Sequence, residues 1–186
     1  MSSWGASAAS DAKPKYLTSV EKRDVYATDQ GWTASAGGND SATAQREVLV
    51  AIGNLGGATA TDKLDAANVS SVNFQSSSFS KAAGGTISVT VNFNETITVS
   101  GTPTVELTND TPARNLTLSY ASGSTTNRLT FSLAIAAANA ATNVADALTI
   151  GVNAMSLAGG TVTNTVGGGN AVITNSAGTG TLTVAT

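Results

Sequence analysis

The chain has 186 residues, of which 11% are charged and none is Cys or His, and its formal net charge is −3. An average soluble domain carries roughly 25% charged residues, so Ser, Thr and Asn must supply most of the polar surface. The missing Cys and His remove thiol chemistry, disulfides, thiolate metal sites and the commonest general base. The acidic balance argues against nucleic acid, whose phosphates need a basic stripe. We therefore expect no enzymatic activity, no cofactor and no nucleic-acid partner.

The first twelve residues have neither the basic region nor the apolar core of a signal peptide. No run of about eighteen apolar residues follows, so we expect no membrane partner. A weakly charged, hydroxyl-rich surface is typical of extracellular adhesins, S-layers and phage particles. Three explanations fit such a chain without a signal peptide. The sequence has been trimmed, export uses another route, or the protein leaves the cell inside a virus particle.

The composition changes near residues 58–67. Both Trp and six of the nine Lys and Arg residues precede residue 64. Such a break predicts two units. We expect an N-terminal docking segment over residues 1–57, a linker over residues 58–67 and a β unit over residues 68–186.

The N-terminal unit shows start and stop signals in chain order. Lys13 precedes a proline and should be extended. Thr18 and Glu21 fit a capping box, which predicts a short helix over residues 19–26. A turn is expected at residues 37–40 and a strand over residues 46–52.

A unit of this size is marginal alone, because such short domains bury only about 60% of their extended-chain surface. Aromatic and cationic residues are the usual anchors of protein interfaces. These side chains either form a docking surface for a partner or pack into a small local core. The candidate docking residues are Trp4, Lys13, Lys15, Tyr16, Lys22, Arg23, Tyr26, Trp32 and Arg46.

Apolar and polar residues alternate through the second unit, as in half-buried strands. The clearest case places Ile87, Val89, Val91 and Phe93 on one face. Turns are expected at Asn94-Glu95, at residues 109–112 and at Gly123, and a loop over the Ala-rich residues 134–147. The predicted strands cover residues 69–74, 86–93, 97–99, 105–107, 116–120, 129–135, 148–152, 172–173 and 182–184. About eight short strands with such turns predict an all-β fold, an antiparallel sandwich with Greek-key connections.

Candidate catalytic and metal sites are weak. Asp24, Asp29, Asp62 and Asp65 lack EF-hand spacing, so calcium could bind only through scattered loop oxygens. Glu95 and Glu106 could imitate a glycosidase pair, but a structural role is favoured. The glycines at 84–85 and 167–169 lack the Lys-Ser/Thr of a phosphate loop and are interpreted as hairpin turns.

Three stretches carry a resemblance. Residues 90–107 (TVNFNETITVSGTPTVEL), 120–131 (YASGSTTNRLTF) and 147–163 (ALTIGVNAMSLAGGTVT) resemble the bacterial Ig-like repeat. This resemblance covers residues 68–186 and implies an Ig-like β-sandwich. Proteins with such repeats act as spacers, adhesion modules and virion appendages, so the likeness implies a fold more than a function.

The N-terminal stretch carries a second resemblance, in Trp4-Gly5, residues 13–17, Glu21-Lys22, residues 25–28, Gly31-Trp32 and residues 47–52. It is similar to the start of virion structural proteins of contractile-tailed phages of marine cyanobacteria. This implies a capsid decoration protein on the particle surface that docks on the major capsid protein. The alternatives are a tail or baseplate fibre component, and an extracellular bacterial adhesion module that binds cell-surface glycan.

Overall fold

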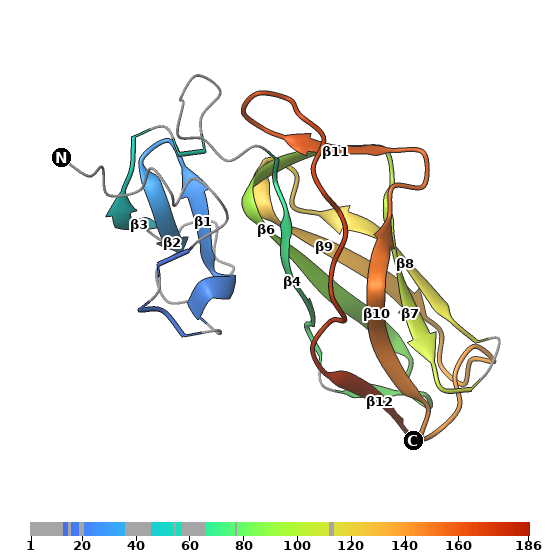
Figure 1. The fold of residues 1–186 in the computed structure, drawn as a ribbon. Helices are drawn as coiled ribbons and strands as arrows, with labels where there is room; N and C mark the ends of the chain where they lie inside the picture. The colour runs from blue at the N-terminus through green and yellow to red at the C-terminus, as the bar shows by residue number, and fades with distance from the viewer. Residues whose placement is uncertain are drawn as a thin grey trace.

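The computed structural model describes residues 13–14, 16–18, 21–35, 46–53, 55–56, 66–76, 78–111 and 114–186. Within these ranges the regular elements are β-strands and one three-residue 3-10 helix, η1 (Glu21–Arg23). The chain is therefore all-β, which confirms the predicted class (Figure 1). The expected turn at residues 37–40 and most of the linker lie outside the described residues.

The predicted helix over residues 19–26 is wrong, although its capping box forms. The Thr18 amide donates to Glu21 Oε2 at 2.8 Å, and the Glu21 amide donates to Thr18 Oγ1 at 3.3 Å. Only η1 follows, and strand β1 (Val25–Thr28) then pairs antiparallel with β2 (Gly31–Ser35). Pairing of the β-branched and aromatic residues in β1 with β2 thus outweighs the local helix signal.

The strands form one twelve-stranded open sheet. Its main path runs β3-β2-β1-β6-β9-β8-β7-β10-β12-β5, and β4 and β11 both pair with β6. The β1–β6 and β12–β5 pairs are parallel and the others are antiparallel. The remaining strands are β3 (Arg46–Ala51), β4 (Val69–Phe74), β5 (Ser78–Ser80), β6 (Gly85–Ser100), β7 (Thr104–Asn109), β8 (Leu116–Ser122), β9 (Thr126–Ile135), β10 (Ala147–Ser156), β11 (Thr161–Asn164) and β12 (Thr181–Ala185).

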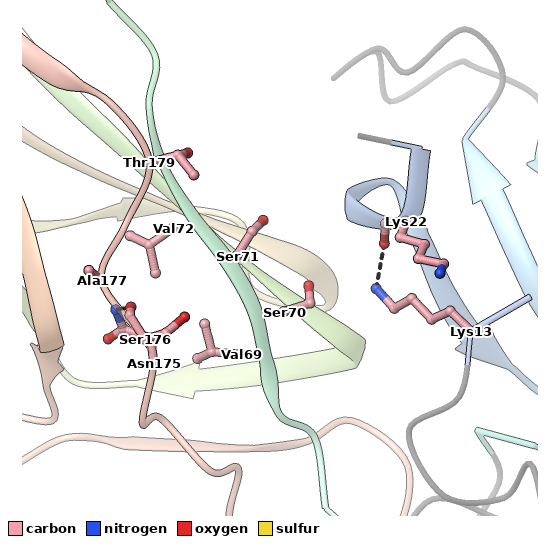
Figure 2. A pocket seen from close by; sticks show the side chains of 10 residues that line it. All are labelled: Lys13, Lys22, Val69, Ser70, Ser71, Val72, Asn175, Ser176, Ala177 and Thr179. Carbon is pink, nitrogen blue, oxygen red and sulfur yellow. Dashed lines mark hydrogen bonds between the residues drawn. The ribbon is translucent and has the colours of Figure 1, made fainter. Parts of the chain in front are cut away.

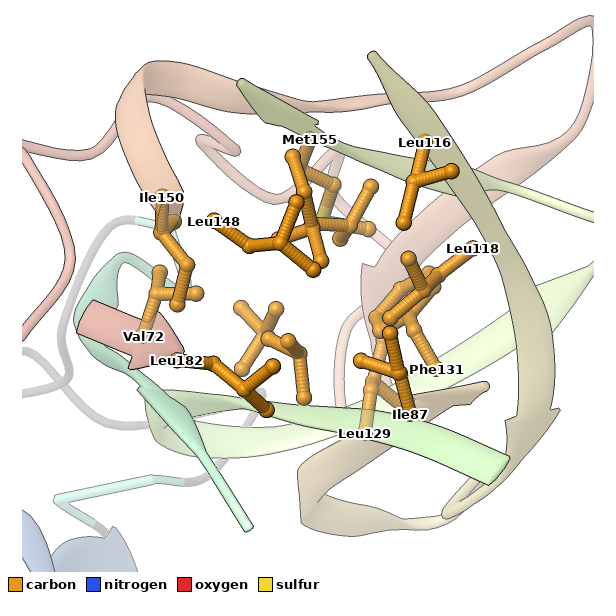
Figure 3. Close-up of a cluster of buried hydrophobic side chains, with 14 of the residues drawn as sticks. Val72, Ile87, Leu116, Leu118, Leu129, Phe131, Leu148, Ile150, Met155 and Leu182 are labelled. Carbon is orange, nitrogen blue, oxygen red and sulfur yellow. The ribbon is translucent and has the colours of Figure 1, made fainter. Parts of the chain in front are cut away.

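Strands far apart in the sheet order contribute side chains to one core. Ile87, Leu129 and Phe131, from β6 and β9, gather with Leu148 and Leu182, from β10 and β12 (Figure 3). The curved sheet therefore encloses a sandwich-like interior. The predicted core face of β6 is confirmed, because Ile87, Val89, Val91 and Phe93 are all buried. The opposite face is only partly exposed, since Thr90 and Asn92 are buried as well.

The turn expected at Asn94-Glu95 is wrong, because β6 continues through both residues to Ser100. Its pairing with β9 shifts register between Asn92 and Ile97, so the irregularity is absorbed within the strand. Partners on both sides hold this stretch extended. Asn94 exchanges hydrogen bonds with Asn68, and Glu95 lies beside Ala27 of β1.

Two further details of the predicted strands differ. Val152 was expected on the core face with Ile150 but is 65% exposed, because a bulge between Ile150 and Met155 reverses the alternation and buries Met155 instead. Residues 172–173 form no strand, and only Val172 makes an isolated bridge, with Asn68. The Ala-rich segment between β9 and β10 is a loop, as predicted, although residues 134–135 and 147 of the predicted range belong to the two strands.

A second hydrophobic cluster lies in the N-terminal strands. It contains Val25, Ala27, Trp32 and Leu55, none of which belongs to the main core. Together β1, β2 and β3 form a small unit of their own beside the main body of the sheet (Figure 1). The boundaries over residues 1–57, 58–67 and 68–186 stay a prediction.

A buried carboxylate joins the loop after β7 to the start of β10. Asp146 accepts hydrogen bonds from Asn109 Nδ2 at 2.9 Å, Thr111 Oγ1 at 2.8 Å and the Asn143 amide at 2.7 Å. Burial raises the pKa of Asp146, but these three hydrogen bonds and nearby Arg114 outweigh it and hold the pKa below its usual value. The ionised carboxylate is therefore the form that the fold requires.

Because of the hydrogen bonds to Asp146, we expect the free energy of unfolding to fall in acid. A carboxyl whose pKa is lower in the folded chain stabilises it above the unfolded-state pKa, and that contribution is lost as the pH falls through the folded-state pKa. We expect Asp146→Asn to lower the free energy of unfolding at pH 7 and to flatten its decline below about pH 4. Urea unfolding across pH would measure both effects, with exposed Asp29→Asn as the control. Parallel pH profiles for wild type and Asp146→Asn would contradict this role.

Candidate functional site

The structure separates the candidate docking residues into three groups. Trp32 and Tyr26 are buried, at 1% and 3% exposure, and Trp32 lies in the N-terminal hydrophobic cluster. Tyr16 is 69% exposed. Lys13 and Lys22 line one pocket. For Trp32, the local-core alternative is therefore the one that the structure supports.

The other candidates are described only in part. Trp4 and Lys15 lie outside the described residues. Arg23 ends η1 and Arg46 begins β3, which places their backbones on the N-terminal unit. A docking role for the exposed and cationic residues stays a prediction.

Sequence reasoning missed the contacts that join the N-terminal unit to the main sheet. Asp24 Oδ1 and Arg128 Nη2 form an ion pair at 2.8 Å, and Arg128 Nε donates to Asn92 Oδ1 at 2.8 Å. Close by, Ala27 of β1 bridges to Glu95 of β6 in parallel. Asp24 and Arg128 are 104 residues apart, so no local pattern signals the pair.

The Asp24–Arg128 pair should make a modest, salt-dependent contribution to this contact. Both side chains are about a quarter exposed, at 25% and 26%. We expect a double-mutant cycle of Asp24→Asn and Arg128→Gln to give a coupling free energy of about 1 kcal/mol or less. The coupling should shrink in about 1 M salt. Additive effects at low salt would show that the pair does not stabilise the contact.

A pocket of about 260 Å³ lies at this junction. Residues 69–72 of β4, residues 175–177 and Thr179 form one side, and Lys13 and Lys22 form the other. Figure 2 shows Ser70 and Ser71 on the side of β4 that faces the lysines. Both serines can face the same side because the β4–β6 register shifts between Val69 and Ser71.

Lys13 is the most perturbed cation of this pocket. Its Nζ donates to the Lys22 carbonyl oxygen at 2.7 Å (Figure 2). Burial lowers the pKa of Lys13 to about 8, and attraction to Asp24 only partly offsets this effect. An ammonium ion is thus held in a poorly solvated position with one neighbouring carboxylate.

The acidic residues do not assemble into a metal or glycosidase site in the described ranges. Glu95 is buried in β6, whereas Glu106 is exposed on β7 and accepts a hydrogen bond from Asn115. Among the described residues, no three His, Cys, Asp or Glu side chains cluster as metal ligands would. Asp62 and Asp65 lie outside those ranges. No helix in the described segments is long and apolar enough to cross a membrane.

Comparison of the whole chain with protein-family models, curated proteins and solved structures finds no match.

Proposed function

We propose that the chain is a structural protein of a tailed-phage particle, a capsid decoration protein without enzymatic activity. In this proposal residues 1–57 attach to the major capsid protein. Residues 68–186 form an Ig-like Greek-key β-sandwich that faces solvent on the particle surface. No cofactor, nucleic acid or membrane takes part.

The strand pairing supports the Ig-like part of the proposal. In the chain order two strands separate β6 from its partner β9, and two separate β7 from its partner β10. Such non-local antiparallel pairs are characteristic of Greek keys. The first two strands of residues 68–186 also pair with strands far apart in the sheet: β4 pairs with β6, and β5 pairs with β12. Sandwich folds use strands that switch sheets in this way.

The observation that carries the attachment proposal is the separate N-terminal core. β1, β2 and β3 pack around Trp32 and meet the main sheet through polar contacts and one strand pairing. β3 ends the sheet path, and no described strand pairs with its outer edge. An edge strand is a ready site for pairing with another chain. Tyr16 and Val48 add exposed apolar surface to the same unit.

Two exposed valines on different units give a matched test. Val48 lies on β3 and is 38% exposed, and Val152 lies on β10 and is 65% exposed. The full chain, Val48→Lys and Val152→Lys would each be mixed with phage particles stripped of this protein and sedimented. We expect the wild type and Val152→Lys to co-sediment, and Val48→Lys to bind about tenfold more weakly. Tyr16→Ala should weaken binding in the same direction.

The remaining outcomes of this experiment identify the alternatives. Loss of binding for Val152→Lys alone would assign attachment to the β unit and reverse the proposal. Binding to isolated tails instead of capsids would support the fibre alternative. Co-sedimentation with bacterial cells and not with particles would support an adhesion module that binds glycan.

A further inference from the structure

Two side chains of the pocket at the junction, Ser71 and Lys13, have hydrogen-bond donors that no acceptor in the described pocket takes up. Ser71 Oγ accepts from Asn92 Nδ2 at 2.9 Å and from Asn73 Nδ2 at 3.0 Å. A hydroxyl has two acceptor sites and one donor. Both acceptor sites of Ser71 are therefore occupied, and within the described part of the chain no group accepts its own hydrogen.

Lys13 contributes further donors. An ammonium group carries three N–H bonds, and the Lys22 carbonyl oxygen accepts one of them. The charged groups around Lys13 in the described structure are Asp24, which also pairs with Arg128, and Lys22 on the same wall of the pocket. Positive charge therefore exceeds negative charge here.

Three other polar side chains of the pocket, those of Ser70, Asn175 and Thr179, already form hydrogen bonds. Asn175 Nδ2 donates to the Gly151 and Ser176 carbonyl oxygens, and its Oδ1 accepts from the Ala154 amide. The Thr179 hydroxyl donates to Asn73 Oδ1. Ser70 Oγ donates to the Asn92 carbonyl oxygen at 3.1 Å. What the pocket lacks is an acceptor with negative charge.

We propose that this pocket binds the carboxylate of an acidic sugar, with Lys13 and Ser71 as the donors to the anionic group. Charge-assisted hydrogen bonds are roughly twice as strong as neutral ones, which would offset the cost of the partly buried ammonium ion. In the absence of ligand, that ion reduces stability because its burial is only partly offset.

The remaining lining fits a sugar ring better than a bare ion. The pocket volume of about 260 Å³ is far larger than one carboxylate requires. Val69, Val72 and Ala177 offer apolar contacts beside the hydroxyls of Ser176 and Thr179. A pyranose presents the same mixture of C–H faces and hydroxyl groups, and small-molecule sites generally combine apolar walls with a few oriented polar groups.

The test is a titration of the full chain followed by amide NMR shifts, using glucuronate, glucose and sodium sulfate as separate probes. Lys13→Gln removes the charge. Lys81→Gln is the matched control, because Lys81 Nζ also donates to a backbone carbonyl oxygen, that of Thr142, but does not line the pocket. We expect glucuronate to shift the amides of Ser70, Ser71 and Ala177, and glucose to leave them unchanged. The dissociation constant should rise about tenfold or more in Lys13→Gln and stay constant in Lys81→Gln.

Ser71→Ala should weaken glucuronate binding about threefold to tenfold without removing a charge. In the wild type, bound carboxylate should raise the pKa of Lys13 from about 8, followed at its side-chain carbon resonances. The proposal is overturned if glucuronate gives no shifts, or if glucose binds as well as glucuronate. Equal amide shifts with sodium sulfate would show that the pocket binds anions in general and is not a sugar site. Unchanged affinity in folded Lys13→Gln would also reject it.

Discussion

Replacing Phe131 with alanine is expected to lower the free energy of unfolding by about 3–5 kcal/mol. Phe131 is fully buried in β9 and meets Tyr120 edge-on, with ring centroids 6.0 Å apart and an interplanar angle of 70°. The substitution removes both the ring contact and the filling of the main core, where the neighbours from β6 and β8 cannot close the cavity fully.

Urea unfolding of wild type and Phe131→Ala measures this loss. Val152→Ala is the control, because Val152 is 65% exposed on β10 and should change stability by no more than about 0.5 kcal/mol. A loss below about 1 kcal/mol for Phe131→Ala would contradict the arrangement of the core.

Trp32→Ala is expected to disrupt the N-terminal unit while the main sheet stays folded. Trp32 is the largest member of a cluster that otherwise contains Val25, Ala27 and Leu55, so truncating it should cost roughly 3–5 kcal/mol locally. A core this small has few other contacts with which to compensate. Loss of particle binding should accompany the change if this unit provides attachment.

Hydrogen exchange read by mass spectrometry separates the two units. We expect faster exchange in β1, β2 and β3 of Trp32→Ala, and unchanged protection in β9 and β10. Trp32→Phe is the matched control. It keeps an aromatic ring and removes the buried indole N–H, for which the described residues offer no acceptor. Equal loss of protection across all strands would show that the two cores fold as one unit.

Much of the main body could be predicted from the sequence because its strands alternate strictly. Val89, Val91 and Phe93 repeat at every second position, and only one sheet face can bury all of them. The alternation fails at Val152 because a bulge in β10 changes which residues face the core. The bulge depends on pairing with β7, which the sequence of β10 alone does not reveal. The Thr18–Glu21 signal correctly predicts a cap but wrongly predicts a short helix over residues 19–26, because β1 pairs with β2 instead.

The candidate site was less accessible to sequence reasoning. Lys13 and Lys22 stood out by charge, but nothing local marks Ser71, whose free donor follows from two amides on β4 and β6. Asp24 and Arg128 meet only after the N-terminal unit lies against β6 and β9. Tyr26 and Trp32 were docking candidates by residue type alone, and only the structure shows that both side chains are buried.

The most direct test of the central claim is electron cryomicroscopy of phage particles that carry this protein. We expect density for the chain on the outer surface of the capsid. The unit formed by β1, β2 and β3 should lie against the major capsid protein, and the body around β6, β9 and β10 should point into solvent. Density confined to the tail, or a β unit facing the capsid with the N-terminal strands outward, would contradict it.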